Sequence, residues 1–551
     1  MIKTIFKRCF LWLIIAIIFT IIQINQSLRQ GQLSLPPSYD DVSYFNDALM
    51  RLDIFYNDGF GGLVSNYTNH TPHSPISALL AFVGFSVFGI KDWAPAFMNF
   101  SIIAIVLIFL DYLSRGLKMR WKVLITLTSL TWLLMGHAVI EFRPDIFCGL
   151  MTAMAIILIS EKSWLSATSI RKKVIGIVFG LALLIKPTIF PVTIILVVSA
   201  IATNILVEKF LLKEKIFLKE VFIKSKEFIL YSVLVSSFYY LFGLKDAINY
   251  IYQNQFVDLE KVWGMHALPF IDRVSYYLLG QGGSMMVGDW IHLWIFLVVI
   301  SGGTVLLKKK WKEQIYLPSL VITGLLAFSI VVISNHKSPF LGVIVACLIF
   351  FTSMQMLIFI IKNIQPFKRS TQKYLNVAIL LFFVFTVYLF EWPAPNDLAA
   401  PEFRTPPERK YHANLLVNIY NDIENDIDYF NARNNLRKYS KEVYLSSMSH
   451  WLQYDSLIYY QMKSGVNNLS IKNGALSDDK VEKIKKINKS DYVIAFSTPS
   501  LDTPDWLPSV RIEKDVVNYL DSSSNFKMIH EYINPYTKAK VFLYAKIYPI
   551  K

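Results

Sequence analysis

The chain has 551 residues, of which 54% are hydrophobic and only 17% are charged, and its mean hydropathy is +0.42. A soluble protein of this length needs more charge to cover its surface, so the composition excludes a purely soluble protein. The formal net charge of +15 is typical of a membrane protein with basic cytoplasmic loops. We therefore expect membrane lipids, and no nucleic acid, among its partners.

Residues 1–25 begin with basic residues and continue as one long apolar stretch. No small-residue cleavage pattern follows, so the sequence predicts an uncleaved membrane anchor. All three cysteines lie within or at the edge of apolar runs, which predicts no disulfide and no thiolate metal site. These cysteines are Cys9, Cys148 and Cys347.

Apolar runs of about 20 residues, the length that a helix needs to cross a bilayer, recur as far as residue 391. They lie near residues 9–25, 93–113, 122–140, 145–160, 173–186, 188–206, 227–244, 289–306, 315–334, 339–361 and 374–391. They predict an α-helical polytopic membrane protein with about eleven spans, twelve or thirteen being the alternatives. Basic loops, such as 208–226, alternate with the less basic loop 245–288. The positive-inside rule then puts the N-terminus in the cytoplasm and the protein in the inner membrane.

The segment 74–89, SPISALLAFVGFSVFG, is apolar but short for a span. If it crossed the membrane, the basic segment RGLKMRWK (115–122) would lie outside and every later loop would be inverted. We therefore interpret it as an interfacial or re-entrant helix, inside one long outer loop over residues 26–92. A true span is the alternative.

The chain changes character after residue 392, where the predicted membrane domain ends. Residues 393–410 are rich in proline and predict a linker. Residues 411–551 contain the helical stretch HANLLVNIYNDIENDIDYFNARNN, the β-rich runs EVYLSS, DYVIAFST and KVFLYAK, and the helical KDVVNYLDS. This pattern predicts a small α/β domain, which the span count places outside the cytoplasm.

Two adjacent carboxylates, Asp40 and Asp41, follow the first span by about a dozen residues. An aspartate in this position is a good helix N-cap, and the apolar residues after it have helical spacing along one stripe. The stripe consists of Val42, Phe45, Leu49 and Leu52. Capping of the helix by one carboxylate and solvation of the other is the first interpretation of the pair, and catalysis is the second.

Further ionisable residues lie at span ends on the same predicted side. Arg143 and Asp145, in EFRPD, are costly at membrane depth unless they pair with each other or with Glu141, or serve a site. Lys186, in LALLIKP, could snorkel to the interface or bind an anion. The other candidates in outer loops are His70, His73, His266, Arg273, His336 and Lys337.

Four motifs in chain order resemble one family. They are the acidic pair with Tyr44 in DDVSYFNDALMRL, the entry of His73 into HSPISALLAFVGFSVFG, the R-x-D of FRPDIFCGLMTAMAIILIS, and the KP of LALLIKPTIFP. Together they resemble the GT-C glycosyltransferases, in the branch with the bacterial aminoarabinose transferases and the protein O-mannosyltransferases. The resemblance covers roughly residues 1–200. The family often has Asp-Glu in place of Asp40–Asp41, and proline in place of the serine after His73.

The resemblance implies an inverting hexosyl- or pentosyltransferase. Such an enzyme moves a sugar from a polyprenyl-phosphate carrier to a lipid, glycan or protein acceptor at the outer face of the membrane. The catalytic carboxylates would be Asp40, Asp41 and Asp145; the donor phosphate would be bound by Arg143, Lys186, Arg273 and Lys337; the substrate would contact Tyr44, His73 and His266. Asp40 and Asp145 could also hold a divalent metal ion, and no other cofactor is expected.

Two other functions compete with this one. A flippase or transporter for lipid-linked glycans predicts charged residues in mid-span and inverted repeats between the halves of the chain. A polymerase or ligase of surface polysaccharides predicts reactive groups in a long late loop such as 245–288. The spans contain few charges in their interiors, and the ionisable residues lie at one face, which favours the glycosyltransferase.

Overall fold

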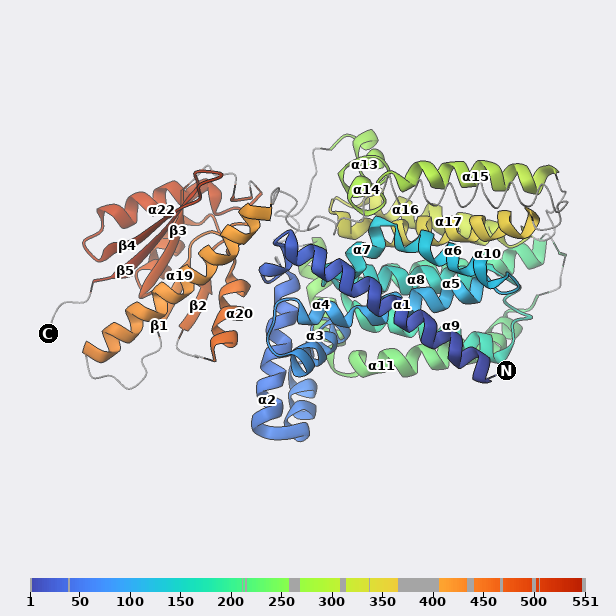
Figure 1. Cartoon of the computed structure of the whole chain (residues 1–551), viewed down its shortest axis with the longest axis horizontal. Coiled ribbons are helices and arrows are strands. Elements are labelled where there is room, and N and C mark those ends of the chain that lie inside the picture. The colour runs from blue at the N-terminus through green and yellow to red at the C-terminus, as the bar shows by residue number, and fades with distance from the viewer. Residues whose placement is uncertain are drawn as a thin grey trace. The chain divides into compact units, whose positions relative to one another are not determined.

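The computed structural model describes residues 2–37, 40–210, 212–213, 216–256, 268–307, 314–335, 337–364, 406–433, 441–465, 469–497, 502–504 and 506–547. The chain forms two compact units (Figure 1). The helical unit comprises Met1–Gln26, Val64–Leu80 and Ala96–Pro395. The mixed unit comprises Ser27–Leu63, Ala81–Pro95 and Asn396–Lys551. The mixed unit therefore combines the C-terminal part of the chain with two segments from the predicted outer loop.

Helices make up the described part of the helical unit. They are α1 (Ile2–Arg29), α4 (Ala94–Met98), α5 (Phe100–Leu113), α6 (Met119–Leu130), α7 (Leu133–Ile140), α8 (Pro144–Ser160), α9 (Ser169–Ile185), η2 (Pro187–Ile189), α10 (Phe190–Phe210), α11 (Leu218–Phe256), α13 (Phe270–Tyr276), α14 (Gln281–Met286), α15 (Trp290–Leu307), α16 (Leu317–Ile333), η4 (Pro339–Gly342) and α17 (Val343–Ile364). The helix α8 packs against α9, α10 and α17, and all but one of its residues are buried. Figure 1 shows α15 and α17 running side by side.

Six segments of the described chain are long and apolar enough to cross a membrane, so this is a multi-pass membrane protein. They are Arg8–Arg29, Ala94–Leu113, Pro187–Phe210, Lys219–Asn254, Trp290–Leu307 and Pro339–Asn363. The predicted count of eleven is not confirmed. Helices α8 and α16 have 17 residues each, a length of about 25 Å. The predicted span 374–391 lies outside the described residues.

The predicted span 122–140 consists of two helices, α6 and α7, bent by 67° at Thr131–Trp132. Near the bend, the hydroxyl groups of Ser129 and Thr131 donate to backbone oxygens three residues earlier, at 2.7 Å each. Such bonds compete with the regular ladder of backbone hydrogen bonds and bend helices. Counted as one broken span, this pair raises the number of candidate spans to seven.

The helix α11 is longer than the sequence predicted. It has 39 residues, so it includes the end of the predicted loop 208–226 and the beginning of the predicted loop 245–288. No proline interrupts it, and the lysine and glutamate residues of its first part are good helix formers. The helix thus continues without a break beyond both ends of the apolar stretch, into residues that the sequence assigned to loops.

Two helices carry the predicted outer loop. The helix α2 (Asp40–Asn69) buries the predicted stripe Val42, Phe45, Leu49 and Leu52. It kinks at Gly59, where a φ of 65° favours glycine. The helix α3 (Pro75–Phe88) has 14 residues, about 21 Å in length, which is short of the roughly 30 Å of a bilayer core. Its length agrees with a helix that does not span the membrane.

The mixed unit contains a five-stranded sheet in the order β2-β1-β3-β5-β4. The strands are β1 (Lys441–Leu445), β2 (Leu469–Asn473), β3 (Tyr492–Phe496), β4 (Phe526–Ile533) and β5 (Lys540–Lys546). The first three strands are parallel, and β5 is antiparallel to both β3 and β4. The other elements are η1 (Gln32–Ser34), α19 (Pro406–Arg433), α20 (Tyr454–Ser464), α21 (Lys480–Ile487) and α22 (Val510–Ser522). The predicted C-terminal α/β region is confirmed.

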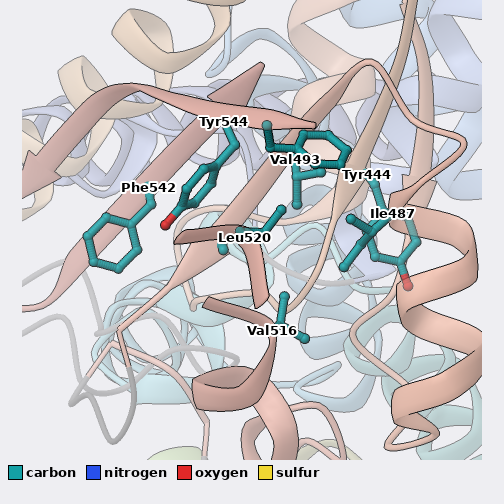
Figure 2. Packing of buried hydrophobic residues seen from close by; sticks show 9 residues of the cluster. Tyr444, Ile487, Val493, Val516, Leu520, Phe542 and Tyr544 are labelled. Atoms are coloured by element: carbon teal, nitrogen blue, oxygen red, sulfur yellow. The ribbon is translucent and has the colours of Figure 1, made fainter. Parts of the chain in front are cut away.

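Helices cover both faces of this sheet. Figure 2 shows Val516 and Leu520 of α22 facing Val493 and Tyr544 of the sheet, in the core on one side. On the other side, Tyr492 donates a hydrogen bond of 2.5 Å to Asp426 of α19. Neighbouring residues of a strand point to opposite faces, so alternate residues of β3 serve the two layers. The predicted boundaries at residues 393 and 411 stay predictions, because residues 365–405 lie outside the described residues.

Candidate active site

An ion pair joins two of the predicted site residues in the helical unit. Lys186, directly after α9, donates to the carboxylate of Asp145, in the first turn of α8. The Asp145 side chain is 5% exposed, and the Lys186 side chain is 16% exposed. Asp145 therefore pairs with Lys186, whereas the sequence suggested Arg143 as its structural partner.

The segment that contains His73 contacts the chain next to Lys186. The hydroxyl of Ser74 donates a 2.7 Å hydrogen bond to the carbonyl oxygen of Ile185, the residue before Lys186. The ring of His73 lies 4.8 Å from the ring of Tyr250 on α11, centroid to centroid. Three segments distant in sequence, around residues 74, 145 and 186, are thus in direct contact at one end of the helices.

Arg143 lies two residues before Asp145, directly before α8. Its guanidinium sits 3.8 Å from the ring centroid of Phe340 in η4, a cation–π distance. Glu141 is buried with His137, whose Nδ1 atom lies 3.7 Å from the Glu141 carboxylate. The loop between α7 and α8 therefore carries one positive charge, on Arg143, and one negative charge, on Glu141, and each packs against a neighbouring side chain.

Two predicted phosphate ligands, Lys337 and Arg273, donate hydrogen bonds to residues near the ends of helices. The ammonium of Lys337 donates to the carbonyl oxygens of Val331 and Val332, at 2.9 and 3.3 Å, and so satisfies the end of α16. Arg273 donates to the carbonyl oxygen of Leu268 at 3.0 Å and to the side chain of Asn335 at 3.3 Å. Both cations have structural hydrogen bonds, and their predicted role in phosphate binding stays a prediction. His266 and His336 lie outside the described residues.

In the mixed unit, the acidic pair opens α2. The side chain of Asp40 is exposed, whereas Asp41 is 1% exposed and Tyr44 is 4% exposed. The hydroxyl of Ser43 donates to the carbonyl oxygen of Asp40 at 2.5 Å, which adds a bond to the first turn. The burial of Asp41 excludes simple solvation as its explanation.

Sequence reasoning missed the partners of this helix. The side-chain amide of Asn46 donates a 2.9 Å hydrogen bond to the carbonyl oxygen of Asp455 on α20. The ring of Phe45 lies 5.9 Å from the ring of Tyr459 on the same helix, and 5.4 Å from the ring of Phe85. No local signal could have identified a contact across 409 positions of sequence.

A second set of bonds secures the segment before α4. The hydroxyl of Tyr459 donates to the carboxylate of Asp92 at 2.6 Å, and the ammonium of Lys463 lies 3.0 Å from the same oxygen. Tyr459 and Lys463 are four residues apart and therefore share one face of α20. Within the mixed unit, α20 thus holds both outer-loop segments.

The side chain of Asp455 is half-buried in the first turn of α20. Burial raises the pKa of Asp455 to about 6, and the negative charge of Asp40 raises it further in the same direction. A carboxyl group with such a pKa takes up and releases a proton close to neutral pH.

The described residues contain no group of three or more histidine, cysteine, aspartate or glutamate side chains suited to a metal ion. Asp145, one of the two predicted metal ligands, is bound by Lys186. The other, Asp40, belongs to the mixed unit. The metal site that the sequence predicts at these two carboxylates stays a prediction.

The chain is similar to two crystal structures of ArnT from Cupriavidus metallidurans, one in the apo state and one bound to undecaprenyl phosphate. The identities are 11% and 10%, and the TM-score is 0.49 for each. The matches cover 95% and 97% of this chain and 97% of each ArnT chain. No family model and no curated protein matches the sequence. At this level the likeness carries no functional argument, so the function is argued from the chain's own residues.

Proposed function

We propose that the protein is a membrane glycosyltransferase that moves a sugar from a polyprenyl-phosphate carrier to an acceptor hydroxyl at the outer face of the membrane. The observation that carries this proposal is the contact between three of the resembling motifs. The HSP segment bonds to Ile185 through Ser74, and the neighbouring Lys186 pairs with Asp145 of the R-x-D segment. Such convergence is expected of a site and not of motifs matched by chance.

The chemistry of the transfer assigns a role to each side chain. The leaving phosphate needs cations, and Lys186 and Arg143 lie at one end of the helices to supply them. Lys186 would exchange Asp145 for the phosphate when the donor binds, since both offer anionic oxygens to its ammonium group. Asp40 and its neighbours would serve the acceptor hydroxyl, which needs a carboxylate base within hydrogen-bond reach.

The orientation follows from the basic loops. The N-terminus and the first part of α11 would lie in the cytoplasm, and the C-terminal part of the chain outside it. The sugar would be transferred with inversion to a lipid, glycan or protein, as in the family that the sequence resembles. A divalent metal ion at Asp40 and Asp145 is implied by the resemblance alone.

A flippase is the second candidate, but the distribution of charge favours the enzyme. In α11, the described stretch from 228 to 244 carries no charge, and in α5 and α6 the pair Asp111–Lys122 lies at adjoining helix ends, 2.6 Å apart. A transporter would be expected to use charges within such stretches.

The test is sugar transfer by the purified protein in detergent, where no membrane is available for lipid flipping. The donors are synthetic polyprenyl-phosphate pentoses and hexoses with tritium-labelled sugars, offered with extracted envelope lipids and glycans. We expect label to leave the carrier with the wild type, and Asp40→Asn to reduce the rate by about 10² or more. The control is Asp515→Asn, an exposed residue of α22. An active Asp40→Asn enzyme would contradict the role of Asp40 and direct attention to Asp41.

A further inference from the structure

The second turn of α2 and the first two turns of α20 lie together in the mixed unit. The side chain of Asn46 donates to the main chain of Asp455, and the ring of the preceding residue, Phe45, contacts the ring of Tyr459, one turn beyond Asp455. Asp40 opens the same helix α2, and its negative charge adds to the effect of burial that raises the pKa of Asp455. Two acidic residues far apart in the sequence therefore belong to the first turns of two helices that contact each other.

We propose that Asp455 is the proton acceptor of the transfer reaction and takes the proton of the acceptor hydroxyl beside Asp40. The proposal rests on the proposed function and extends it to a residue of the C-terminal domain. It also assigns a chemical task to a domain for which the sequence offered none.

A buried hydrogen-bond acceptor next to Asp455 points to a ligand with hydroxyl groups. Asn46 is 8% exposed, and its amide nitrogen is used by Asp455. Among the described residues, none donates a hydrogen bond to the Oδ1 atom of the same side chain. A buried acceptor without a donor destabilises the folded state, because the acceptor has given up its hydrogen bond to water. A hydroxyl of a sugar or polyol would supply the missing donor and would bring a neighbouring hydroxyl to Asp455.

The position of Asp455 in the sheet topology supports the same conclusion. The connection β1–α20–β2 leads to one side of β1, and β3 pairs with its other side. Ligands of such sheets bind beyond the carboxyl ends of the strands, at the point where the strand order reverses. Asp455 begins the helix that follows the carboxyl end of β1, so it stands next to this point.

The loop that carries α20 is fixed by buried bonds. The backbone N–H of His450 donates to the carbonyl oxygen of Asp502 at 3.1 Å, and the ring of Trp451 stacks on His412 with centroids 5.0 Å apart. The backbone N–H of Gln453 donates to the hydroxyl of Ser456 at 2.9 Å, which closes the first turn of α20. These contacts hold the first turn of α20 in place, and with it Asp455. A catalytic base needs such a fixed position to meet its substrate.

The electrostatic surroundings set Asp455 for proton transfer near neutral pH. Its pKa of about 6 makes it a stronger base than an ordinary aspartate while it is still ionised at pH 7. On α2, besides Asp40, the charged residues are Asp41, Asp47, Arg51, Asp53 and Asp58, and of these Asp47 and Arg51 form an ion pair of 3.0 Å. On α20 itself the neighbouring titratable group is Tyr454, whose pKa is raised by burial and by Asp455.

The oxygen of the acceptor hydroxyl forms a bond to the anomeric carbon of the donor sugar, and its proton passes to the carboxylate of Asp455. The bond between that carbon and the phosphate oxygen breaks, and its electron pair stays on the polyprenyl phosphate. Asp455 then releases its proton to water.

The experiment compares Asp455→Asn, Asp455→Glu and Asp40→Asn in the full-length protein, with the tritium-labelled donors described above. Because Asn46 binds the main chain of Asp455, both substitutions at 455 leave that contact in place. Thermal unfolding of each purified variant reports whether it is folded. The control is Asp515→Asn, whose carboxylate makes only an exposed ion pair with Lys480.

We expect Asp455→Asn to fold but to lose transfer by about 10² or more, and Asp455→Glu to recover part of the rate. In the wild type, kcat/KM should fall below a pH of about 6, as Asp455 becomes protonated. The residual activity of Asp455→Asn should lack this fall. The inference is overturned if Asp455→Asn keeps the rate and the pH profile of the wild type while Asp40→Asn is inactive. If both Asn variants are fully active, the assignment of Asp40 fails as well.

Discussion

Tyr459 and Asp92 are joined by a hydrogen bond of 2.6 Å, although 367 positions separate them in the sequence. Tyr459 belongs to α20, and Asp92 belongs to the short segment between α3 and α4. With Lys463, which binds the same carboxylate, this bond ties the outer loop to the C-terminal domain inside the mixed unit.

Removal of this carboxylate should destabilise the mixed unit. In Asp92→Ala, the buried hydroxyl of Tyr459 and the ammonium of Lys463 lose their shared acceptor, at a cost of about 1–3 kcal/mol. We expect thermal unfolding at a lower temperature and faster cleavage by a protease added to the purified protein. In the control, Asp515→Ala, an exposed pair with Lys480 is lost, and the change should stay within about 0.5 kcal/mol. Equal effects of the two substitutions would contradict the role of Asp92.

The pair Lys186–Asp145 allows stability to be separated from chemistry. Lys186→Met leaves the Asp145 carboxylate buried without its cation, which should cost about 3–5 kcal/mol. The double variant Lys186→Met/Asp145→Asn removes both charges, so thermal unfolding should return toward the wild type. If Lys186 binds the donor phosphate, sugar transfer by the double variant should stay lost and should be slower than in Asp145→Asn alone, which keeps the ammonium group. Recovery of both stability and transfer would leave Lys186 a purely structural role.

The C-terminal domain should become less stable as the pH falls. Burial lowers the pKa of His412 to about 4, against the opposing effect of the Asp502 carboxylate. Between pH 6.5 and 4 the unfolded chain binds a proton that the folded chain does not bind, so stability decreases with decreasing pH, by an amount on the order of 2–3 kcal/mol. Between pH 7 and 4.5, the unfolding temperature of His412→Gln should fall by less than that of the wild type. His530→Gln, at an exposed position of β4, should retain the slope of the wild type.

The proposed orientation can be tested with single cysteines. Lys472→Cys, exposed after the middle of β2, should react with a thiol reagent that does not cross membranes in intact cells. Lys224→Cys, exposed in the first part of α11, should react only after the cells are opened. The reverse pattern would mean that the predicted span count is wrong by an odd number, with residues 74–89 the first segment to re-examine.

Local patterns in the sequence predicted local structure well. The spacing of Val42, Phe45, Leu49 and Leu52 identified a buried helix face, and the runs EVYLSS, DYVIAFST and KVFLYAK correspond to β1, β3 and β5. Residue type carries this information, because periodicity and propensity act within one element. The strand β4, FKMIHEYI, has mostly exposed residues, so it lacked the apolar pattern of a strand.

The sequence could not predict which distant residues meet. Asp455 looks like any acidic residue in the first turn of a helix, and only the packing of Phe45 against Tyr459 brings it to α2. The same holds for Asp145, whose partner proved to be Lys186 and not the nearer Arg143. A helix has several faces, and the partner of each is decided by the packing of the whole unit.

The mixed unit has a consequence for biosynthesis. Its segments 27–63 and 81–95 emerge from the ribosome long before α20, which must follow the whole series of membrane helices. Until then the side chain of Phe45 lacks its contact with Tyr459, and exposed apolar surface of this kind attracts chaperones and proteases. A chain that stops early can never complete this unit. The arrangement therefore makes the stability of the first outer loop depend on full-length synthesis, and only finished molecules would escape quality control.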